Sequence, residues 1–118
     1  MQIETKLSDQ LARFMDLAVT EAKVTAGNMA NIDTPGYRAQ GFDFTAEMRS
    51  ALSGLNTGRP AQIHVGDVDG LVSRPDGNNV SMDREGLNLA EAQLRFKTGV
   101  ALLRLENQRV MDAIHADK

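Results

Sequence analysis

Hydrophobic side chains recur at alternating intervals of four and three residues in two long stretches, one near each end of the chain. In the first stretch, from about residue 8 to residue 32, the repeat falls on Leu11, Met15, Ala18, Ala22, Thr25, Met29 and Ile32. In the second, from about residue 83 to residue 116, it falls on Leu89, Gln93, Phe96, Val100, Leu103, Asn107, Val110 and Ile114. Because this spacing lines up one face of a helix, it predicts two long amphipathic helices of the heptad type.

The second stretch carries a further apolar stripe, on Leu87, Ala90, Leu94, Ala101, Leu102 and Leu105. A helical hairpin covers one stripe on each helix, so we expect one stripe of the C-terminal helix to lack a partner within the chain. An uncovered apolar stripe of this kind indicates a partner surface. A self-contained helical domain is the alternative. Gln93 and Asn107 interrupt the main stripe, where they either fix the register of packing or face water or a neighbour's backbone.

Glycine and proline mark the boundaries of a middle segment. Eight of the ten glycines and all three prolines lie between Pro35 and Gly86, which is typical of irregular structure. We therefore predict one domain of the all-α class in three parts. The parts are an N-terminal helix over residues 1–34, an irregular or hairpin segment over residues 35–82, and a C-terminal helix over residues 83–118.

Short patterns within the middle segment predict local structure. Residues 42–44 alternate like a strand, residues 47–52 suit a short helix, and residues 53–59 have the composition of a loop. Residues 74–78 (Arg-Pro-Asp-Gly-Asn) are a turn signal, because proline presets one dihedral angle and glycine or asparagine adopts the left-handed one. Short apolar runs flank the turn, at Leu71-Val72 and Val80-Ser81-Met82, so we expect a small hairpin there.

Composition excludes several function classes. The 118 residues include no cysteine, which removes a disulfide scaffold, an iron–sulfur site and a thiol nucleophile. The formal charge of −3 and the lack of a basic run argue against nucleic-acid binding. No run approaches the roughly 20 apolar residues of a spanning helix, so we expect no membrane insertion. Charged residues interrupt Met1 to Phe14, so we also expect no cleavable signal peptide.

Candidate catalytic and metal-binding groups are few. His64 lies in an apparent short strand, Gln62-Ile63-His64-Val65, and His115 falls in the last helical turn. Asp67-Val68-Asp69-Gly70 resembles the opening of a calcium loop, but the further ligands are missing at the required spacing. We therefore predict no catalytic, cofactor-binding or metal-binding residues, and no enzyme.

One segment is more specific than any of these patterns. Residues 26–39 (Ala-Gly-Asn-Met-Ala-Asn-Ile-Asp-Thr-Pro-Gly-Tyr-Arg-Ala) resemble the N-terminal signature of the bacterial flagellar rod and hook family. In that signature a long helix ends in Asn-x-x-Asn-x-x-Thr-Pro-Gly-Tyr, and its positions here are Asn28, Asn31, Thr34, Pro35, Gly36 and Tyr37. Asparagines near a helix end can bond backbone groups that lack helical partners. Residues 74–85 resemble the segment before the C-terminal helix in a short proximal-rod member of the family.

The resemblance implies a structural subunit of the basal-body rod, the drive shaft that crosses the periplasm and transmits torque for motility. It implies terminal helices that pair as a coiled coil, a helical tube of subunits, and export through the flagellar type III apparatus without signal cleavage. The implied partners are other rod subunits, the export apparatus and the adaptor that joins the rod to the membrane ring. We expect the assembly interface to include Leu11, Met15, Ala18, Ala22, Met29, Leu89, Phe96, Val100, Leu103, Val110 and Ile114. The alternatives are a second proximal-rod member, an export chaperone and a secreted coiled-coil protein.

Overall fold

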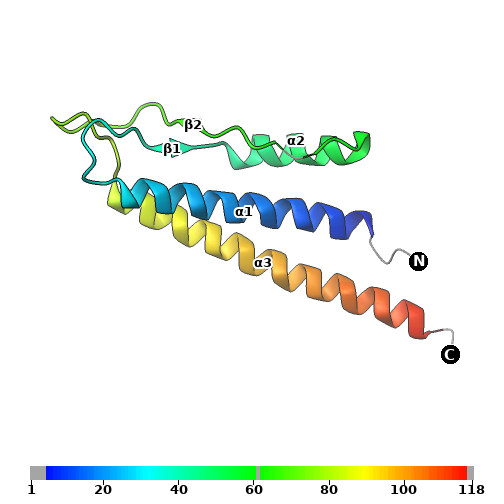
Figure 1. Cartoon of the computed structure of the whole chain (residues 1–118). Helices are drawn as coiled ribbons and strands as arrows, with labels where there is room; N and C mark the ends of the chain where they lie inside the picture. The colour runs from blue at the N-terminus through cyan, green and yellow to red at the C-terminus, as the bar shows by residue number, and fades with distance from the viewer. Residues whose placement is uncertain (1–4, 61, 117–118) are drawn as a thin grey trace.

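The computed structural model describes residues 5–60 and 62–116. The outermost residues of the predicted terminal helices, 1–4 and 117–118, lie outside this description. Along the chain the elements are α1 (Lys6–Ala30), β1 (Gln40–Gly41), α2 (Phe44–Thr57), β2 (Gly66–Asp67) and α3 (Met82–His115). They form an elongated body of 69 × 27 × 18 Å in which α1 lies between α2 and α3 (Figure 1).

The two long helices pack against each other in opposite directions, so the start of α1 lies beside the later part of α3 (Figure 1). Each helix buries one residue in every seven along this contact. On α1 these are Leu11, Ala18 and Thr25, and on α3 they are Glu85, Ala92, Gly99 and Glu106. A seven-residue repeat on both partners is the pattern of a coiled coil, which confirms the predicted pairing.

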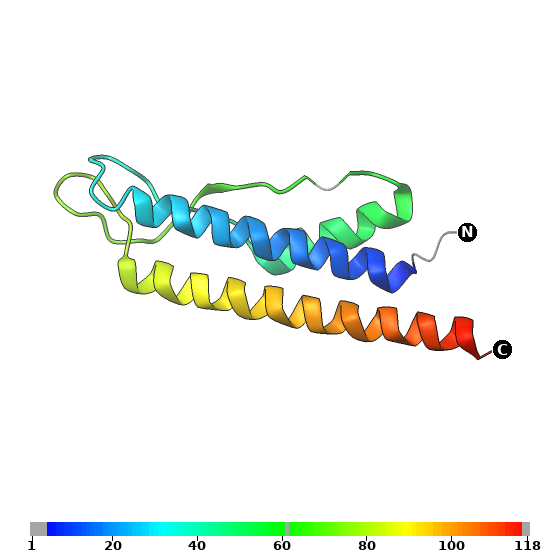
Figure 2. The same cartoon turned by 60° about the horizontal axis from the view of Figure 1, so that its bottom comes forward.

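Helix α2 packs on α1, on the side away from α3 (Figures 1 and 2). It begins where the Asp43 carboxylate accepts a hydrogen bond from the Ala46 N–H at 3.1 Å, and it ends at Gly58 with a φ of 71°. Phe44 meets Phe14 of α1 edge to face, with ring centroids 5.6 Å apart. The predicted strand over residues 42–44 and loop over residues 53–59 are therefore wrong, because Asp43 caps a helix that continues to Thr57.

The sheet is a two-residue ribbon in which Gln40 pairs with Asp67 and Gly41 pairs with Gly66. The predicted turn at residues 74–78 forms, since the Gly77 N–H donates to the Arg74 carbonyl at 2.9 Å. No strand flanks this turn, however, so the predicted hairpin is wrong, and residues 62–65 also form no strand. The Arg74 N–H bonds the Asn78 carbonyl across the turn, but the pairing goes no further, because the backbone of residues 76, 79 and 80 bonds the loop that follows α1 and the Asn78 side chain instead.

Candidate assembly interface

The family motif forms the junction between α1 and the ribbon. Asn28 is almost fully buried, and its amide bonds both backbone groups of Gln40. Its Nδ2 donates to the Gln40 carbonyl at 2.8 Å, and its Oδ1 accepts from the Gln40 N–H at 2.9 Å. The Tyr37 hydroxyl also donates to Oδ1, at 3.4 Å. Asn28 therefore binds β1 as a neighbouring strand would, which fixes the ribbon on the last turn of α1.

Asn31 closes the end of the same helix. Its Nδ2 donates to the Gly27 carbonyl at 2.8 Å, and its Oδ1 accepts from the Thr34 hydroxyl at 3.1 Å. The chain then turns at Gly36, whose φ of 74° favours glycine and whose N–H donates to the Asp76 carbonyl at 2.9 Å. Carbonyl groups that the helix leaves free thus acquire side-chain partners, and the exit direction of the chain is set.

A second pair of asparagines, which sequence analysis did not single out, holds this junction from the other side. Asn78 is fully buried, and its Nδ2 lies 2.9, 3.0 and 2.9 Å from the carbonyl oxygens of Asn31, Ile32 and Thr34. Its Oδ1 accepts from the Val80 N–H at 2.8 Å. The signals in the sequence were the turn pattern of residues 74–78 and the resemblance of residues 74–85 to the family, and neither indicated that these side chains bond the loop after α1.

Asn79 and Arg74 add further bonds between the same two loops. The Asn79 Oδ1 accepts from the Ala39 N–H at 2.6 Å, and the Asn79 N–H donates to the Tyr37 carbonyl at 3.3 Å. The Arg74 guanidinium donates to the Ile32 and Val80 carbonyls. The end of α1 and the segment that leads into α3 are therefore joined through side chains, although about 50 residues separate them in the sequence.

Most of the residues predicted for the assembly interface lie along the contact between α1 and α3, whereas Ile114 lies at the end of α3, beyond the Thr5–Glu106 hydrogen bond where α1 begins. Leu11 and Ala18 are buried there. The half-buried members are Met15, Ala22, Met29, Leu89, Val100, Leu103 and Val110. Phe96 and Ile114 are each 39% exposed. Within one subunit most of these side chains already have a partner helix, and their part in contacts between subunits stays a prediction.

The line of α3 residues buried against α1, which we call the seam, is displaced by one residue from the predicted line. Gln93 and Asn107 are exposed, and the buried positions are Ala92 and Glu106. Gly99 explains the displacement, because a Cβ at this position would lie 2.6 Å from the Met15 Cγ. Small residues at the centre of the contact let the helices approach, while larger apolar residues lie beside the centre.

Arg95 joins all three helices. Its guanidinium pairs with the Glu21 carboxylate of α1 at 2.6 Å and lies over the Phe44 ring of α2, 4.1 Å from the ring centroid. A guanidinium suits both contacts, because it forms planar ion pairs with carboxylates and stacks on aromatic rings. This junction fixes where α2 begins relative to the coiled coil.

Two carboxylates, Glu85 and Glu106, are buried in the seam. Glu106 accepts hydrogen bonds from Arg109, at 3.1 Å on each oxygen, and from the Thr5 hydroxyl at 2.9 Å. The bonds from Arg109 and then Thr5 hold the pKa of Glu106 below its ordinary value. Glu85 accepts from Arg84 at 2.9 Å on Oε1, whereas its buried Oε2 has no hydrogen-bond partner within the described part of the chain.

The candidate catalytic and metal-binding side chains do not converge on one site. His64 is exposed, 3.3 Å from the Glu47 carboxylate, and His115 is exposed at the end of α3. Asp67 accepts from the Gln40 side chain at 2.6 Å. Over residues 5–60 and 62–116, no three His, Asp or Glu side chains gather closely enough to hold a metal ion. None of the helices in those ranges is long and apolar enough to cross a membrane.

The second stripe of α3 is exposed along its whole length, as the sequence predicted. Leu87, Leu94 and Leu105 are 63%, 67% and 67% exposed, and Leu102 is 45% exposed. Ala90 and Ala101 are also exposed. Leu87 and Leu94 each follow a buried seam residue by two positions, which is about 200° around a helix, so they face away from α1. Among the elements formed by residues 5–60 and 62–116, none covers that side of α3 (Figures 1 and 2).

Known proteins similar to this chain support the predicted membership of the flagellar rod and hook family, although no family model matches the chain. The chain is 33% identical to the flagellar basal body rod protein FlgB of Cereibacter sphaeroides, over 96% of this chain and 99% of the relative. It is 30% identical to FlgB of Salmonella typhimurium and 29% identical to FlgB of Escherichia coli, over 85% and 86% of this chain. Those alignments cover 86% and 88% of the two relatives. FlgC, the alternative within the same rod and hook family, is not better supported by these relatives. The chain therefore belongs to the family of the flagellar basal body rod protein FlgB.

Proposed function

We propose that this chain is a structural subunit of the proximal flagellar rod, the shaft that crosses the periplasm and transmits torque. The observation that carries the proposal is the exposed leucine stripe of α3, in a chain whose relatives are named basal body rod proteins. A shaft needs subunits that hold their shape and offer apolar faces to their neighbours. The elongated coiled coil supplies the first requirement and the stripe supplies the second.

In this mechanism the seam between α1 and α3 makes each subunit stiff, and the asparagine junction fixes the ribbon and α2 on it. The stripe then contacts a neighbour. Burying one leucine contributes roughly 1.5–3 kcal/mol, so the stripe can supply a strong joint between subunits. Head-to-tail contacts that do not close into a ring produce a helical filament.

The proposal includes partners and a location. The partners are other rod subunits, the adaptor between the rod and the membrane ring, and the flagellar type III export apparatus. Subunits reach the periplasmic rod without cleavage of a signal peptide. The support is the resemblance of the motif segment to rod and hook proteins together with the family of the relatives. The intact mass of the chain recovered from basal bodies tests the last point, since a shortened N-terminus would contradict it.

Deletion of the gene, followed by electron microscopy of isolated basal bodies and a swimming assay, tests the function. We expect membrane rings without a rod, no swimming, and recovery of both when the gene is restored. Leu94→Asp should fail to restore the rod, because it places a charge in the exposed stripe. A matched control is Gln93→Asp, which places a charge on the same helix outside the stripe and should restore it. Complete rods in the deletion strain would contradict the proposal and favour an export chaperone.

A further inference from the structure

An apolar pocket opens between the three helices, on the side of α1 that carries α2. Its volume is about 230 Å³, and its apolar lining comes from Leu11, Phe14, Met48, Leu52 and Leu102. The backbones of α2 and α3 each pack on α1 and do not approach each other over the described residues, so the pocket stays open to solvent between them. An open apolar pocket at this place can receive an apolar side chain from outside the subunit.

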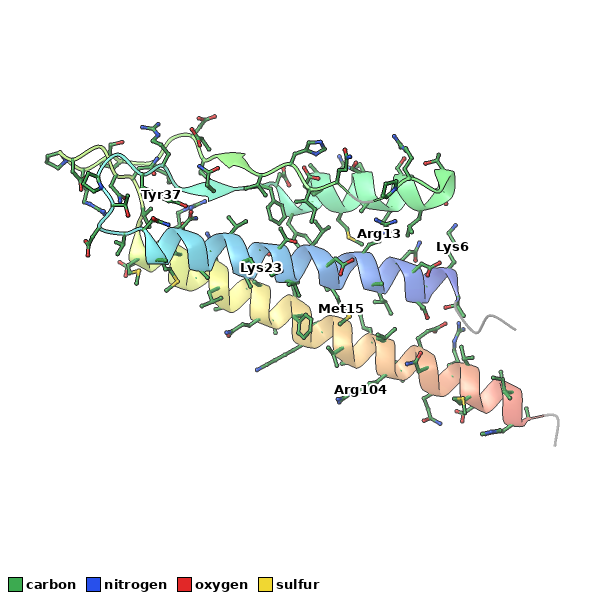
Figure 3. All side chains as sticks on the ribbon, viewed as in Figure 1. Lys6, Arg13, Met15, Lys23, Tyr37 and Arg104 are labelled. Carbon is green, nitrogen blue, oxygen red and sulfur yellow. The ribbon has the colours of Figure 1, made fainter. Side chains whose placement is uncertain are left out.

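The part of the rim that α1 supplies is basic. Lys6 and Arg13 lie about 80° and 100° around the helix from Phe14, on the same flank of it. Figure 3 shows both side chains on the side of α1 that faces α2. Asp9 and Asp16 lie about 140° and 160° around the helix from Phe14, so they face away from the pocket.

The part of the rim that α2 and α3 supply adds a further cation, because the nearby carboxylates are engaged inside the subunit. Arg49 is exposed on α2, next to the pocket residue Met48. Glu47 lies 3.3 Å from His64. Glu106 of α3 is buried and holds its ion pair with an arginine of its own helix. The charge that the rim presents to a partner is therefore positive.

The opposite end of the molecule has the complementary character. Val72 is 90% exposed, more than any other large apolar residue in the described part of the chain. It lies in the loop between β2 and α3, which Figure 1 shows at the end of the body away from the start of α1. Residues 66–76 contain three aspartates, all exposed, against one arginine. That arginine, Arg74, donates to carbonyl groups of the subunit.

We propose that the pocket receives Val72 of a second copy of this chain, with the acidic loop of one copy against the basic rim of the next. Opposite charges at a contact guide the approach of the correct partner and disfavour a reversed one. The loop and the pocket lie at opposite ends of the body, so a copy bound through its loop still has a free pocket. The contact is therefore heterologous and repeats end to end without closing on itself. This inference rests on the proposed function and adds a second joint to the one that the leucine stripe makes.

Cysteine cross-linking tests the contact, because the chain has no cysteine of its own. Val72→Cys and Leu52→Cys variants, each with a different epitope tag, are expressed together in the deletion strain, and isolated basal bodies are oxidised. We expect mixed dimers in several-fold excess over Val72→Cys dimers. Met48→Cys, at a second position in the pocket, should give the same result as Leu52→Cys.

The matched control for this experiment is a pair of Val72→Cys with Ser53→Cys. Ser53 is exposed on the same helix, about 100° around it from Leu52 and outside the pocket. The Leu52→Cys pair should give several-fold more mixed dimers than this control. Predominant Val72→Cys dimers, or mixed dimers no more abundant than in the control pair, would overturn the inference.

Charge reversal tests whether the acidic loop meets the basic rim. Asp69→Arg in the Val72→Cys copy should lower the yield of mixed dimers several-fold, and Arg49→Glu in the Leu52→Cys copy should restore it. Both positions are exposed. An unchanged yield with Asp69→Arg, or no recovery with Arg49→Glu, would overturn the pairing. If the parent chain restores rods but no excess of mixed dimers forms, this contact is wrong while the rod function stands. If the deletion strain builds rods by itself, the proposed function fails.

Discussion

The replacement of Asn78 by alanine probes the junction between the loop after α1 and the loop before α3. The wild-type side chain is fully buried, lies 2.9–3.0 Å from three carbonyl oxygens, and accepts one N–H bond at 2.8 Å. Its two N–H groups and one oxygen can satisfy three hydrogen bonds. At about 0.5–1.5 kcal/mol net for each bond, Asn78→Ala should cost about 2–4 kcal/mol of unfolding free energy. Arg74 still bonds the Ile32 carbonyl, which favours the lower half of this range.

The assay is a urea titration of the purified chain, followed by circular dichroism. The buffer contains a stabilising osmolyte, so that the slender parent chain is folded at the start of the titration. Amide exchange at Val80 reports whether the loop opens without global unfolding. Asn78→Asp has the same shape but replaces the donor with an acceptor that faces three carbonyls, so it should cost more than alanine. Asn56→Ala, at an exposed position of α2, is the matched control and should change stability by less than about 0.5 kcal/mol.

Two results would refute the reasoning on Asn78. One is an Asn78→Ala chain with the stability of the Asn56→Ala control and unchanged exchange at Val80. The other is an Asn78→Asp chain as stable as the parent, since a carboxylate cannot donate to the carbonyl oxygens.

Three further predictions concern the seam. Gly99→Val should cost about 1–3 kcal/mol in the urea titration, because a Cβ there would lie 2.6 Å from the Met15 Cγ. Gly86→Ala is the control, because a Cβ at this position would meet open space, and it should be neutral or stabilising. Equal changes in stability for Gly99→Val and Gly86→Ala would contradict the close contact between Gly99 and Met15. Because its pKa is lowered in the folded chain, Glu106 should stabilise the fold above its ordinary value of 4.5 and lose this contribution as the pH falls through the folded value. Glu106→Gln should make the melting temperature depend less steeply on pH over that acid range. A pH dependence equal to that of the parent chain would contradict this prediction. Glu85→Met should raise the unfolding free energy by about 1–3 kcal/mol, because it removes a buried oxygen without a partner. The melting temperature should rise accordingly. A lower melting temperature would show that this oxygen is satisfied.

Periodicity predicted the features of this chain that repeat along a helix. A stripe of side chains every three or four residues specifies a face regardless of what packs on it. The pattern therefore located α1 and α3 and showed that α3 carries more apolar surface than one partner covers. The uncovered stripe at Leu87, Leu94 and Leu105 is the consequence, and the structure shows it exposed.

Periodicity could not select the centre of the α1–α3 contact. The predicted and observed seam positions, such as Gln93 and Ala92, are about 100° apart around the helix, and large apolar residues flank both, so the periodic pattern does not choose between them. Close approach of the helices decided between them, because Ala92 and Gly99 are small and Met15 fills the space beside Gly99. The polar seam position is consequently Glu106 and not Asn107.

The middle segment depended most on tertiary structure, because its backbone bonds side chains that are distant in the sequence. The turn at residues 74–78 was predictable from its own dihedral preferences. Its flanks form no hairpin, since Asn78 and Asn79 bond the loop that follows α1. By itself, then, the sequence determined the helices, the open stripe and the family motif, which are local or periodic. Only the tertiary structure decided which buried amides and carboxylates meet, because those partners are brought together by folding and not by spacing along the chain.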